Sequence, residues 1–225
     1  MKIEPIAFFK SPLSSKFGIP RQSGLVQDLP GSIVFTDAFH DAEGLRGLEE
    51  FDYLWLIWGF SMNVHAEKHA TVRPPLLGGN ERLGVWATRS PFRPNNLGLS
   101  SVRIVKVHHD ACTIDVAGAD LMDGTPIYDV KPYLPYTDSH AEARAGFTDS
   151  HQWEHLQVVI PPAVQEVLGA TDCRLLEQVL SLDPRPHYHH TSDRIYGMPF
   201  RLYDVHFKVV QGVLYVVNIV KNRDV

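Results

Sequence analysis

The sequence has little cysteine and no apolar run long enough to cross a bilayer. Its 225 residues include two cysteines, Cys112 and Cys173, which lie far apart and outside any CxxC pattern. We therefore expect two buried free thiols rather than a disulfide or a thiolate metal site. A membrane helix needs roughly 20 consecutive apolar residues. The N-terminal apolar run is shorter than a signal peptide requires and is interrupted by Glu4 and Pro5. These absences predict a soluble, cytoplasmic protein with no membrane partner.

Several catalytic signatures are also missing. The chain contains no GxGxxG, no P-loop and no GxSxG elbow, so these signatures of a Rossmann site, a nucleotide-binding loop and an α/β-hydrolase are absent. HAEKH at 65–69 is close to the zinc-protease pattern, but Ala66 stands where that pattern requires Glu. The histidines of HYHH at 187–190 are too close along one loop to face one ion together. We expect no metal site.

The charge is acidic overall but unevenly distributed. The net charge is −5, which argues against a general nucleic-acid coat. Between residues 68 and 106 there are seven basic residues and one acid, whereas 107–155 holds nine acids and two bases. A basic face on an acidic protein suits an anionic ligand bound locally. Two solvated surfaces would explain the same pattern.

The apolar pattern predicts short strands separated by loops. We expect strands at 3–9, 32–35, 51–62, 84–88, 99–107, 112–117 and 126–130. The run at 51–62 is continuously apolar, which predicts a central strand buried on both faces. Only 41–50 and a stretch after Asp138 look helical in this half. Strands with few helices between them favour a β-barrel over a doubly wound sheet.

The pattern changes after about residue 150. Helical spacing begins at Pro162, which fits a first helical turn, and continues through Leu180. Two alternating runs at 203–210 and 213–220 flank Gln211-Gly212, which predicts a hairpin. We expect a mainly β protein with a barrel domain over 1–150 and a small α+β domain over 151–225.

Three loops combine prolines with hydrogen-bonding side chains. They are KFGIPRQSG at 16–24, the stretch from VRPPLLGGN through GVWATRSPFRPNNLG at 72–98, and LMDGTPIYDVKPYLPY at 121–136. Proline removes backbone freedom, so such loops are partly ordered before a ligand arrives. Prolines that merely end strands would explain one such loop, but three in one domain favour a binding site.

The motif blocks resemble a known family. ATRSPFRPNNLGLS, KFGIPRQSGLV, GLEEFDYLWLIWGF, DLMDGTPIYDVKPYLPYTDS and DPRPHY are similar to the TsaA-like (YaeB) proteins, whose characterised bacterial members are of the TrmO type. The resemblance implies a β-barrel that binds S-adenosylmethionine and a homodimer with the cofactor near the subunit contact. It also implies methylation of N6 of threonylcarbamoyladenosine at position 37 of a threonine tRNA.

The resemblance also implies which residues hold the cofactor. Carried over residue by residue, the contacts fall on Pro20, Arg21, Gln22, Ser61, Met62, Arg89, Leu99, Asp123, Gly124, Thr125 and Pro126. Ser61 and Met62 stand where many relatives have His-Gln, so a side-chain contact there is lost or replaced by backbone. An arginine such as Arg89 can hold the cofactor carboxylate bidentately. Arg93 faces tRNA phosphate or holds its own loop.

The implied chemistry calls for a proton acceptor and for tRNA contacts. The N6 nitrogen beside a carbamoyl group is a weak nucleophile with an acidic proton, so a general base would help. Asp123, Asp129 and Tyr133 are the candidates, and the sequence does not choose among them.

The DPRPHY block lies outside the barrel motifs. We expect Asp183, Arg185 and Tyr188 to handle the tRNA, the arginine through phosphate and the tyrosine by stacking on a base. A loop that docks the two domains is the other interpretation. Two further functions stay open for the whole chain: a non-catalytic barrel that binds S-adenosylmethionine, and a metal-dependent hydrolase that uses the histidines.

Overall fold

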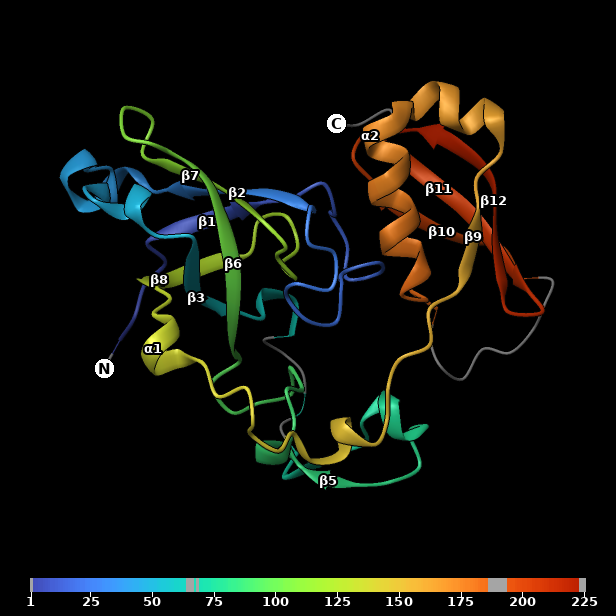
Figure 1. Cartoon of the computed structure of the whole chain (residues 1–225), viewed down its shortest axis with the longest axis horizontal. Coiled ribbons are helices and arrows are strands. Elements are labelled where there is room, and N and C mark those ends of the chain that lie inside the picture. Colours follow the sequence, from blue (N-terminus) through green and yellow to red (C-terminus); the bar gives the residue numbers. More distant parts are fainter. Residues whose placement is uncertain (1, 64–66, 68, 186–193, 223–225) are drawn as a thin grey trace.

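The chain folds into two units, seen side by side in the computed structural model of Figure 1. The structure describes residues 2–63, 67, 69–185 and 194–222. One unit, called the barrel unit below, is built from the first part of the chain. The other, the C-terminal unit, contains the long helix and the last four strands. A long connection over residues 139–156 joins the two units.

Six strands close into the predicted barrel. Around the barrel they run β1 (Ala7–Lys10), β2 (Pro30–Phe35), β7 (Thr113–Ala117), β6 (Leu97–His108), β3 (Tyr53–Gly59) and β8 (Pro126–Pro132). All neighbouring pairs are antiparallel. Inward side chains alternate with outward ones along each strand of a barrel. The interior is a single apolar core that includes Phe9, Ile33 and Ile127.

The apolar run at 51–62 behaves differently from its prediction. Leu54, Leu56 and Trp58 are buried inside the barrel, whereas Tyr53 on the outer face is 41% exposed. The expectation of burial on both faces is therefore wrong. A closed barrel packs only its inner face, whereas a doubly wound sheet has helices over both faces.

Shorter elements of the barrel unit depart from the predicted boundaries. The expected strand at 84–88 is wrong: β5 is Leu83–Gly84, paired with β4 (Thr71–Val72), and a 3₁₀ turn follows at Val85–Ala87. The helical stretch at 41–50 forms two 3₁₀ turns, Ala42–Leu45 and Leu48–Glu50. Helix α1 (Pro135–Asp138) ends where a helix was expected to begin. Other 3₁₀ turns span Asp37–Phe39, Ser61–Asn63, Pro75–Leu77 and Gly146–Asp149.

The C-terminal unit is one helix on one sheet. Its strands run in the order β10 (Tyr196–Phe200), β11 (Tyr203–Val210), β12 (Val213–Lys221) and β9 (Gln157–Val159), and the predicted hairpin is β11–β12. Helix α2 spans Pro162–Ser181 as its spacing predicts. Gly169 interrupts it with φ 76°, which a glycine adopts readily. Of the predicted apolar face, Val164 and Leu176 are buried but Val167 is 54% exposed.

The core of the C-terminal unit includes residues from the start of the chain. Leu13, Val26 and Leu29 belong to the same buried cluster as Leu176 on α2 and Phe207 on β11. The segment between β1 and β2 therefore packs into the core that the helix and the sheet of the C-terminal unit form. This packing attaches the C-terminal unit to the barrel unit through the body of the protein as well as through the connection.

The two cysteines are free thiols, as expected. Cys112 is buried and Cys173 is partly exposed, so the expectation of burial holds for the first only. None of the helices within the described ranges is both long and apolar enough to span a membrane.

Candidate active site

A cavity of about 220 Å³ opens at one end of the barrel. The end of β3, the 3₁₀ turn at 61–63, the loop before β6 and the loop between β7 and β8 form its walls. The lining is mostly apolar and aromatic, with Trp58, Phe60, Met62, Pro91 and Met122, and its polar groups include Lys16, Asp120 and Thr125. Pockets for drug-sized ligands occupy roughly 300–1,000 Å³. This cavity can therefore take one part of a molecule the size of S-adenosylmethionine, with the rest lying across its mouth.

A buried chain of hydrogen bonds ends at this cavity. Trp58 Nε1 donates to Ser100 Oγ over 2.9 Å, and Ser100 Oγ donates to Asp120 Oδ1 over 2.6 Å. Ser100 is 2% exposed and sits on the inner face of β6. Burial raises the pKa of Asp120, and this effect outweighs the Ser100 hydrogen bond and the charge of Arg89, which both lower it.

Sequence reasoning missed this carboxyl group. The available signal was Ser100, a polar residue at an inward position of a strand whose next inward residue is Val102. A polar side chain facing a barrel interior needs a hydrogen-bonding partner. Asp120 is that partner, although it is 20 residues away along the chain.

The predicted Asp123–Pro126 block serves mainly to hold the loop in shape. Asp123 Oδ1 accepts the Ser11 backbone N–H over 3.0 Å, and Thr125 Oγ1 donates to the Met122 carbonyl over 2.7 Å. Thr125 lines the cavity, whereas Asp123 is not among the lining residues. The Gly124 N–H donates to the Phe9 carbonyl, so the block is tied to the end of β1.

Arg89 joins two of the predicted cofactor loops. Its Nη1 donates to Gln22 Oε1, which links the loop before β6 to the loop after β1. Pro20 of the latter loop is buried. Arg89 itself is exposed, so its guanidinium is accessible to a ligand.

Arg93 holds its own loop, one of the two roles predicted for it. Its Nη1 donates to the Thr88 carbonyl over 2.7 Å, and its guanidinium lies 5.6 Å from the centre of the Trp86 ring. Leu99, predicted to contact the cofactor, is 57% exposed on β6 opposite Ile57. Ser61 and Met62 both line the cavity.

The other two candidate bases lie on the outer face of the barrel. Asp129 pairs with Lys131 at 3.3 Å, and the Tyr133 ring packs 5.5 Å from the Trp55 ring, centre to centre. Neither residue lines the cavity. The three candidate bases are therefore not brought together, and none of them borders this space.

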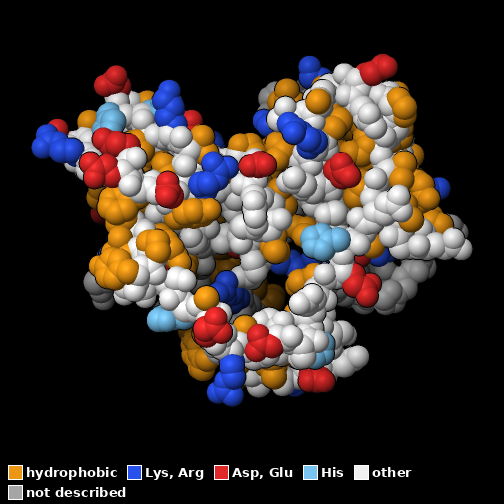
Figure 2. All heavy atoms as spheres, viewed as in Figure 1, with side chains coloured by type: hydrophobic (Ala, Val, Ile, Leu, Met, Phe, Trp, Pro, Cys, Tyr) orange, Lys and Arg blue, Asp and Glu red, His pale blue; other side chains and the backbone are white. Residues whose placement is uncertain are grey.

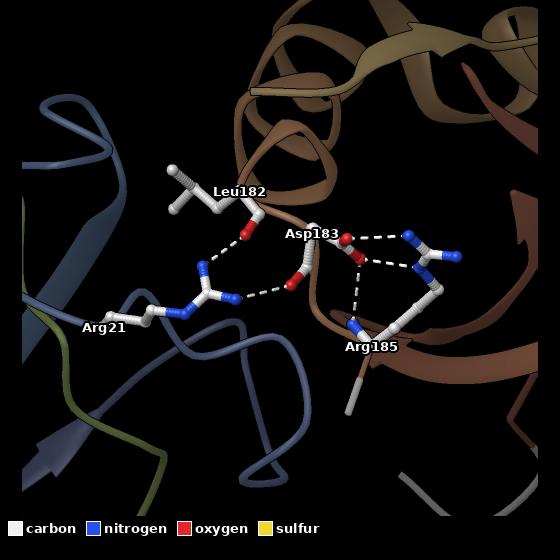
Figure 3. A network of polar contacts seen from close by, with 4 residues as sticks. All are labelled: Arg21, Leu182, Asp183 and Arg185. Carbon is white, nitrogen blue, oxygen red and sulfur yellow. Dashed lines mark hydrogen bonds and ion pairs between the residues drawn. The ribbon is translucent and has the colours of Figure 1, made fainter. Parts of the chain in front are cut away.

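Arg21 reaches the C-terminal unit instead of the cavity. Figure 3 shows its guanidinium directed at the end of α2, where Nη1 donates to the Leu182 carbonyl and Nη2 to the Asp183 carbonyl, the latter over 2.8 Å. The same guanidinium lies 3.8 Å from the centre of the Trp153 ring. Its burial lowers the pKa of Arg21, an effect that the charge of Asp183 partly offsets. Arg21 is thus a bridge between the two units.

The predicted tRNA residues of the DPRPHY block pair with each other. Arg185 Nε and Nη2 donate to the two carboxylate oxygens of Asp183, each over 2.8 Å. Burial pushes the pKa of Asp183 upward, but the hydrogen bond and charge of Arg185 outweigh it and hold that pKa below its usual value. A second cavity of about 220 Å³ lies here, bordered by Arg21, Asp183 and Arg185. Tyr188 lies outside the described residues.

Figure 2 shows the molecule hollowed between the two units, with Lys and Arg side chains at the edge of the hollow. Within the described residues, no three His, Cys, Asp or Glu side chains are grouped as a metal site would require. His65 and the histidine run at 187–190 lie outside those residues.

Replacing Arg21 with alanine should loosen the contact between the two units. A hydrogen bond to a charged group contributes about 1.5–3 kcal/mol, and Arg21 makes two such bonds. We expect faster proteolysis of the 139–156 connection and a free energy of unfolding lower by about 1–3 kcal/mol. Limited proteolysis and urea unfolding measure both. Arg144→Ala, at an exposed position of the connection, is the control; equal effects in the two variants would contradict the bridge.

Two domain models of known proteins match the chain, one in each of the two units. The sequence model of the tRNA-methyltransferase O N-terminal domain matches residues 8–139, and that of the TrmO C-terminal domain matches 153–222. The chain is 38% identical over 195 residues to a tRNA (adenine(37)-N6)-methyltransferase of Escherichia coli, covering 83% of each. It is 37% identical over 221 residues to a putative S-adenosylmethionine-dependent methyltransferase of Pseudomonas aeruginosa, covering 91% of each. A crystal structure of TrmO from Pseudomonas aeruginosa superposes with a TM-score of 0.81 at 30% identity, covering 99% of this chain and 97% of that one.

Proposed function

The chain belongs to the tRNA-methyltransferase O family, and on that premise we propose that it is an S-adenosylmethionine-dependent methyltransferase acting on N6 of adenosine 37 in tRNA. The relatives that carry this activity in their names match most of the chain. In finer detail, we propose that the accepting base is threonylcarbamoyladenosine and that the tRNA is a threonine tRNA.

The observation that carries the proposal is the cavity at the barrel end. S-adenosylmethionine combines an aromatic adenine, a positive sulfonium and an amino acid with a carboxylate. The aromatic rings of Trp58 and Phe60 suit a cation or an adenine face, and the Asp120 carboxyl group suits positive charge. Arg89 is exposed, and it lies close enough to Asp120 for its charge to lower the pKa of that carboxyl group. Its guanidinium can bind the carboxylate of the cofactor. The residues present therefore fit the cofactor.

The chain's own contribution is positioning. The bound cofactor supplies the methyl group, and an in-line transfer gains roughly 7–11 kcal/mol in favourable cases from holding the two reacting atoms in place. The loops that would hold the cofactor are fixed by Arg93 on the Thr88 carbonyl and by Asp123 on the Ser11 amide. The general base is proposed among Asp123, Asp129 and Tyr133; a change of loop position or a second copy of the chain would have to bring it to the cavity.

The tRNA would lie across the hollow between the two units. Arginines at such a surface neutralise phosphates. We propose that Arg93, Asp183, Arg185 and Tyr188 serve this substrate, with the barrel domain over 1–150 holding the cofactor and the domain over 151–225 holding the tRNA. Its two bonds to Asp183 hold the Arg185 guanidinium in one orientation.

We propose that the protein acts as a cytoplasmic homodimer. Four large apolar side chains in segments near the cavity are strongly exposed: Met62, Trp86, Phe92 and Leu99. Exposed apolar groups gathered in one region are typical of a surface that another chain covers. A protein that sediments as a monomer at micromolar concentration would contradict the dimer.

The test of the function is methyl transfer to tRNA, with Arg89→Ala as the diagnostic variant. We expect mass spectrometry of tRNA incubated with the protein and S-adenosylmethionine to show one added methyl group on the nucleoside at position 37. Losing a charge-assisted contact costs about 1.5–3 kcal/mol, so Arg89→Ala should bind the cofactor roughly 10- to 150-fold more weakly by calorimetry. Arg46→Ala, an exposed arginine of the 3₁₀ region, is the control.

Two results would separate the alternatives. Cofactor binding without any methylated nucleoside would favour a non-catalytic binding module. Loss of methyl transfer on adding a chelator, with recovery on adding zinc, would favour metal chemistry.

A further inference from the structure

Asp120 carries a partly buried carboxyl group that lines the cavity. One of its oxygens, Oδ1, accepts the Ser100 hydroxyl, and the backbone of Ser23 also hydrogen-bonds the carboxyl group. Ser100 is itself held by the Trp58 indole N–H. The carboxyl group is therefore fixed in position by a chain of side chains before any ligand arrives. Ser100 and Thr125 are the fully buried polar residues of the described chain; Thr125 lines this cavity, and Ser100 bonds two residues that line it, Trp58 and Asp120.

The positive groups near Asp120 already have other partners. Lys16 lines the same cavity, but its ammonium group donates to the Met62 carbonyl and to Asn63 Oδ1. Arg89, whose charge affects Asp120, donates to Gln22. Among the described residues that line the cavity, Asp120 is the one carboxyl group. Much of the wall consists of aromatic rings, thioethers and a proline, which solvate a carboxylate poorly.

We propose that Asp120 recognises the positive sulfonium of the methyl donor and thereby makes the site prefer the donor over its demethylated product. This rests on the proposed function, in which the cavity takes S-adenosylmethionine. When the methyl group leaves, the S–C bond breaks, its electron pair stays on sulfur, and the sulfonium becomes a neutral thioether. The attraction between Asp120 and the ligand is then lost, which favours release of the product.

The sulfonium is a better match than the ligand's ammonium. An ammonium group seeks three hydrogen-bond acceptors, whereas a sulfonium has no N–H or O–H to donate and is stabilised by nearby negative charge and by aromatic faces. The cavity is lined by one carboxyl group, that of Asp120, and by the Trp58 and Phe60 rings, which pack edge to face 4.4 Å apart, centre to centre. The lining therefore supplies both charge and aromatic surface.

Binding of the donor should release a proton from Asp120. Burial raises the pKa of this carboxyl group in the free protein, so its protonated form persists to a higher pH than that of an exposed aspartate. A positive charge beside it favours the carboxylate, and the proton leaves to the solvent. The affinity for the donor should therefore fall as the pH drops through the raised pKa, and the affinity for the neutral-sulfur product should change less.

The test compares Asp120→Asn with the wild-type full-length protein by calorimetry. Asparagine keeps an oxygen that can accept the Ser100 hydroxyl, so the hydrogen-bond chain is preserved. The probes are S-adenosylmethionine and S-adenosylhomocysteine, each titrated at pH 6 in two buffers of different ionisation enthalpy. We expect the preference for the methylated ligand to fall about tenfold or more in the variant, equivalent to about 1.4 kcal/mol. Proton release on binding the methylated ligand should disappear.

Asp115→Asn is the matched control. Asp115 also accepts a serine hydroxyl, from Ser32 over 2.6 Å, but it does not line the cavity. Its pKa is lowered, mainly by that hydrogen bond and a second one with His108. This variant should keep both the preference and the proton release.

Each result decides a different point. Two results in a folded Asp120→Asn protein would overturn the role of Asp120: an unchanged preference for the methylated ligand, or an equal loss of affinity for both ligands. If Asp120→Asn does not fold, Ser100→Ala provides the measurement: it removes a bond that favours the carboxylate, so more proton should be released while the preference persists. Failure of the wild-type protein to bind either ligand would instead overturn the proposed function.

Discussion

Gly98→Ala should disrupt the cavity by displacing Trp58, one of the residues that line it. A Cβ at this position would lie 2.3 Å from Cε2 of Trp58, its neighbour across the β3–β6 pair. Contacts below 3.0 Å do not occur, so the indole must move. Because Trp58 is buried in the barrel and donates to Ser100, the movement breaks the chain that holds Asp120.

We expect this single methyl group to affect both stability and binding. Overpacking a core costs about 1–3 kcal/mol, and a displaced Trp58 also leaves Ser100 without its donor. The free energy of unfolding in urea should fall by that amount, the tryptophan emission should shift, and cofactor affinity should drop at least tenfold. Gly44→Ala is the control, since nothing lies within 4 Å of its Cβ position. Wild-type emission and affinity in Gly98→Ala would show that the indole is not constrained there.

Leu13→Ala should destabilise the C-terminal unit although Leu13 follows the first strand. Leu13 is fully buried in the cluster that includes Leu176 and Phe207. Truncation of a buried leucine to alanine costs about 2–5 kcal/mol, depending on how far the cavity collapses. We expect the loss in urea unfolding, together with faster hydrogen exchange in β11 and β12.

The matched control for this variant lies in the same segment. Leu25 is 44% exposed, and Leu25→Ala should change the free energy of unfolding by less than about 0.5 kcal/mol. Hydrogen exchange that speeds up only in the barrel strands of Leu13→Ala would mean that the segment belongs to the barrel alone.

The alternation of side chains was enough to predict much of the fold. In β6 the inward Val102 and the outward Arg103 follow from period two, although the pattern left open whether Leu99 or Ser100 faces inward; the β11–β12 hairpin follows from Gln211-Gly212 between two alternating runs. The run at 51–62 led to a wrong prediction of burial on both faces. A barrel strand with an apolar outer face has the same composition as a strand that is covered on both faces. Tyr53 and Trp55 face outward there.

The site was predicted less completely than the fold. Ser61, Met62 and Thr125, which the family resemblance assigns to the cofactor, line the cavity, and their contact with the cofactor stays a prediction. Arg21 lies in the loop between β1 and β2, which also borders the cavity through Lys16 and Ile19, yet its guanidinium bonds the end of α2. Sequence alone could not show this, since the two positions are 161 residues apart.

By itself, the sequence determined the barrel class, the hairpin, the helix from Pro162 and the family, because each depends on local periodicity or on motif blocks read in order. Only the tertiary structure decided that Trp58, Ser100 and Asp120 are joined by hydrogen bonds and that Leu13 belongs to the core of the C-terminal unit. The reason is physical. Burial and its effect on the pKa of Asp120 depend on which distant segments exclude water from a group. No local sequence pattern indicates which distant segments will exclude water from Asp120.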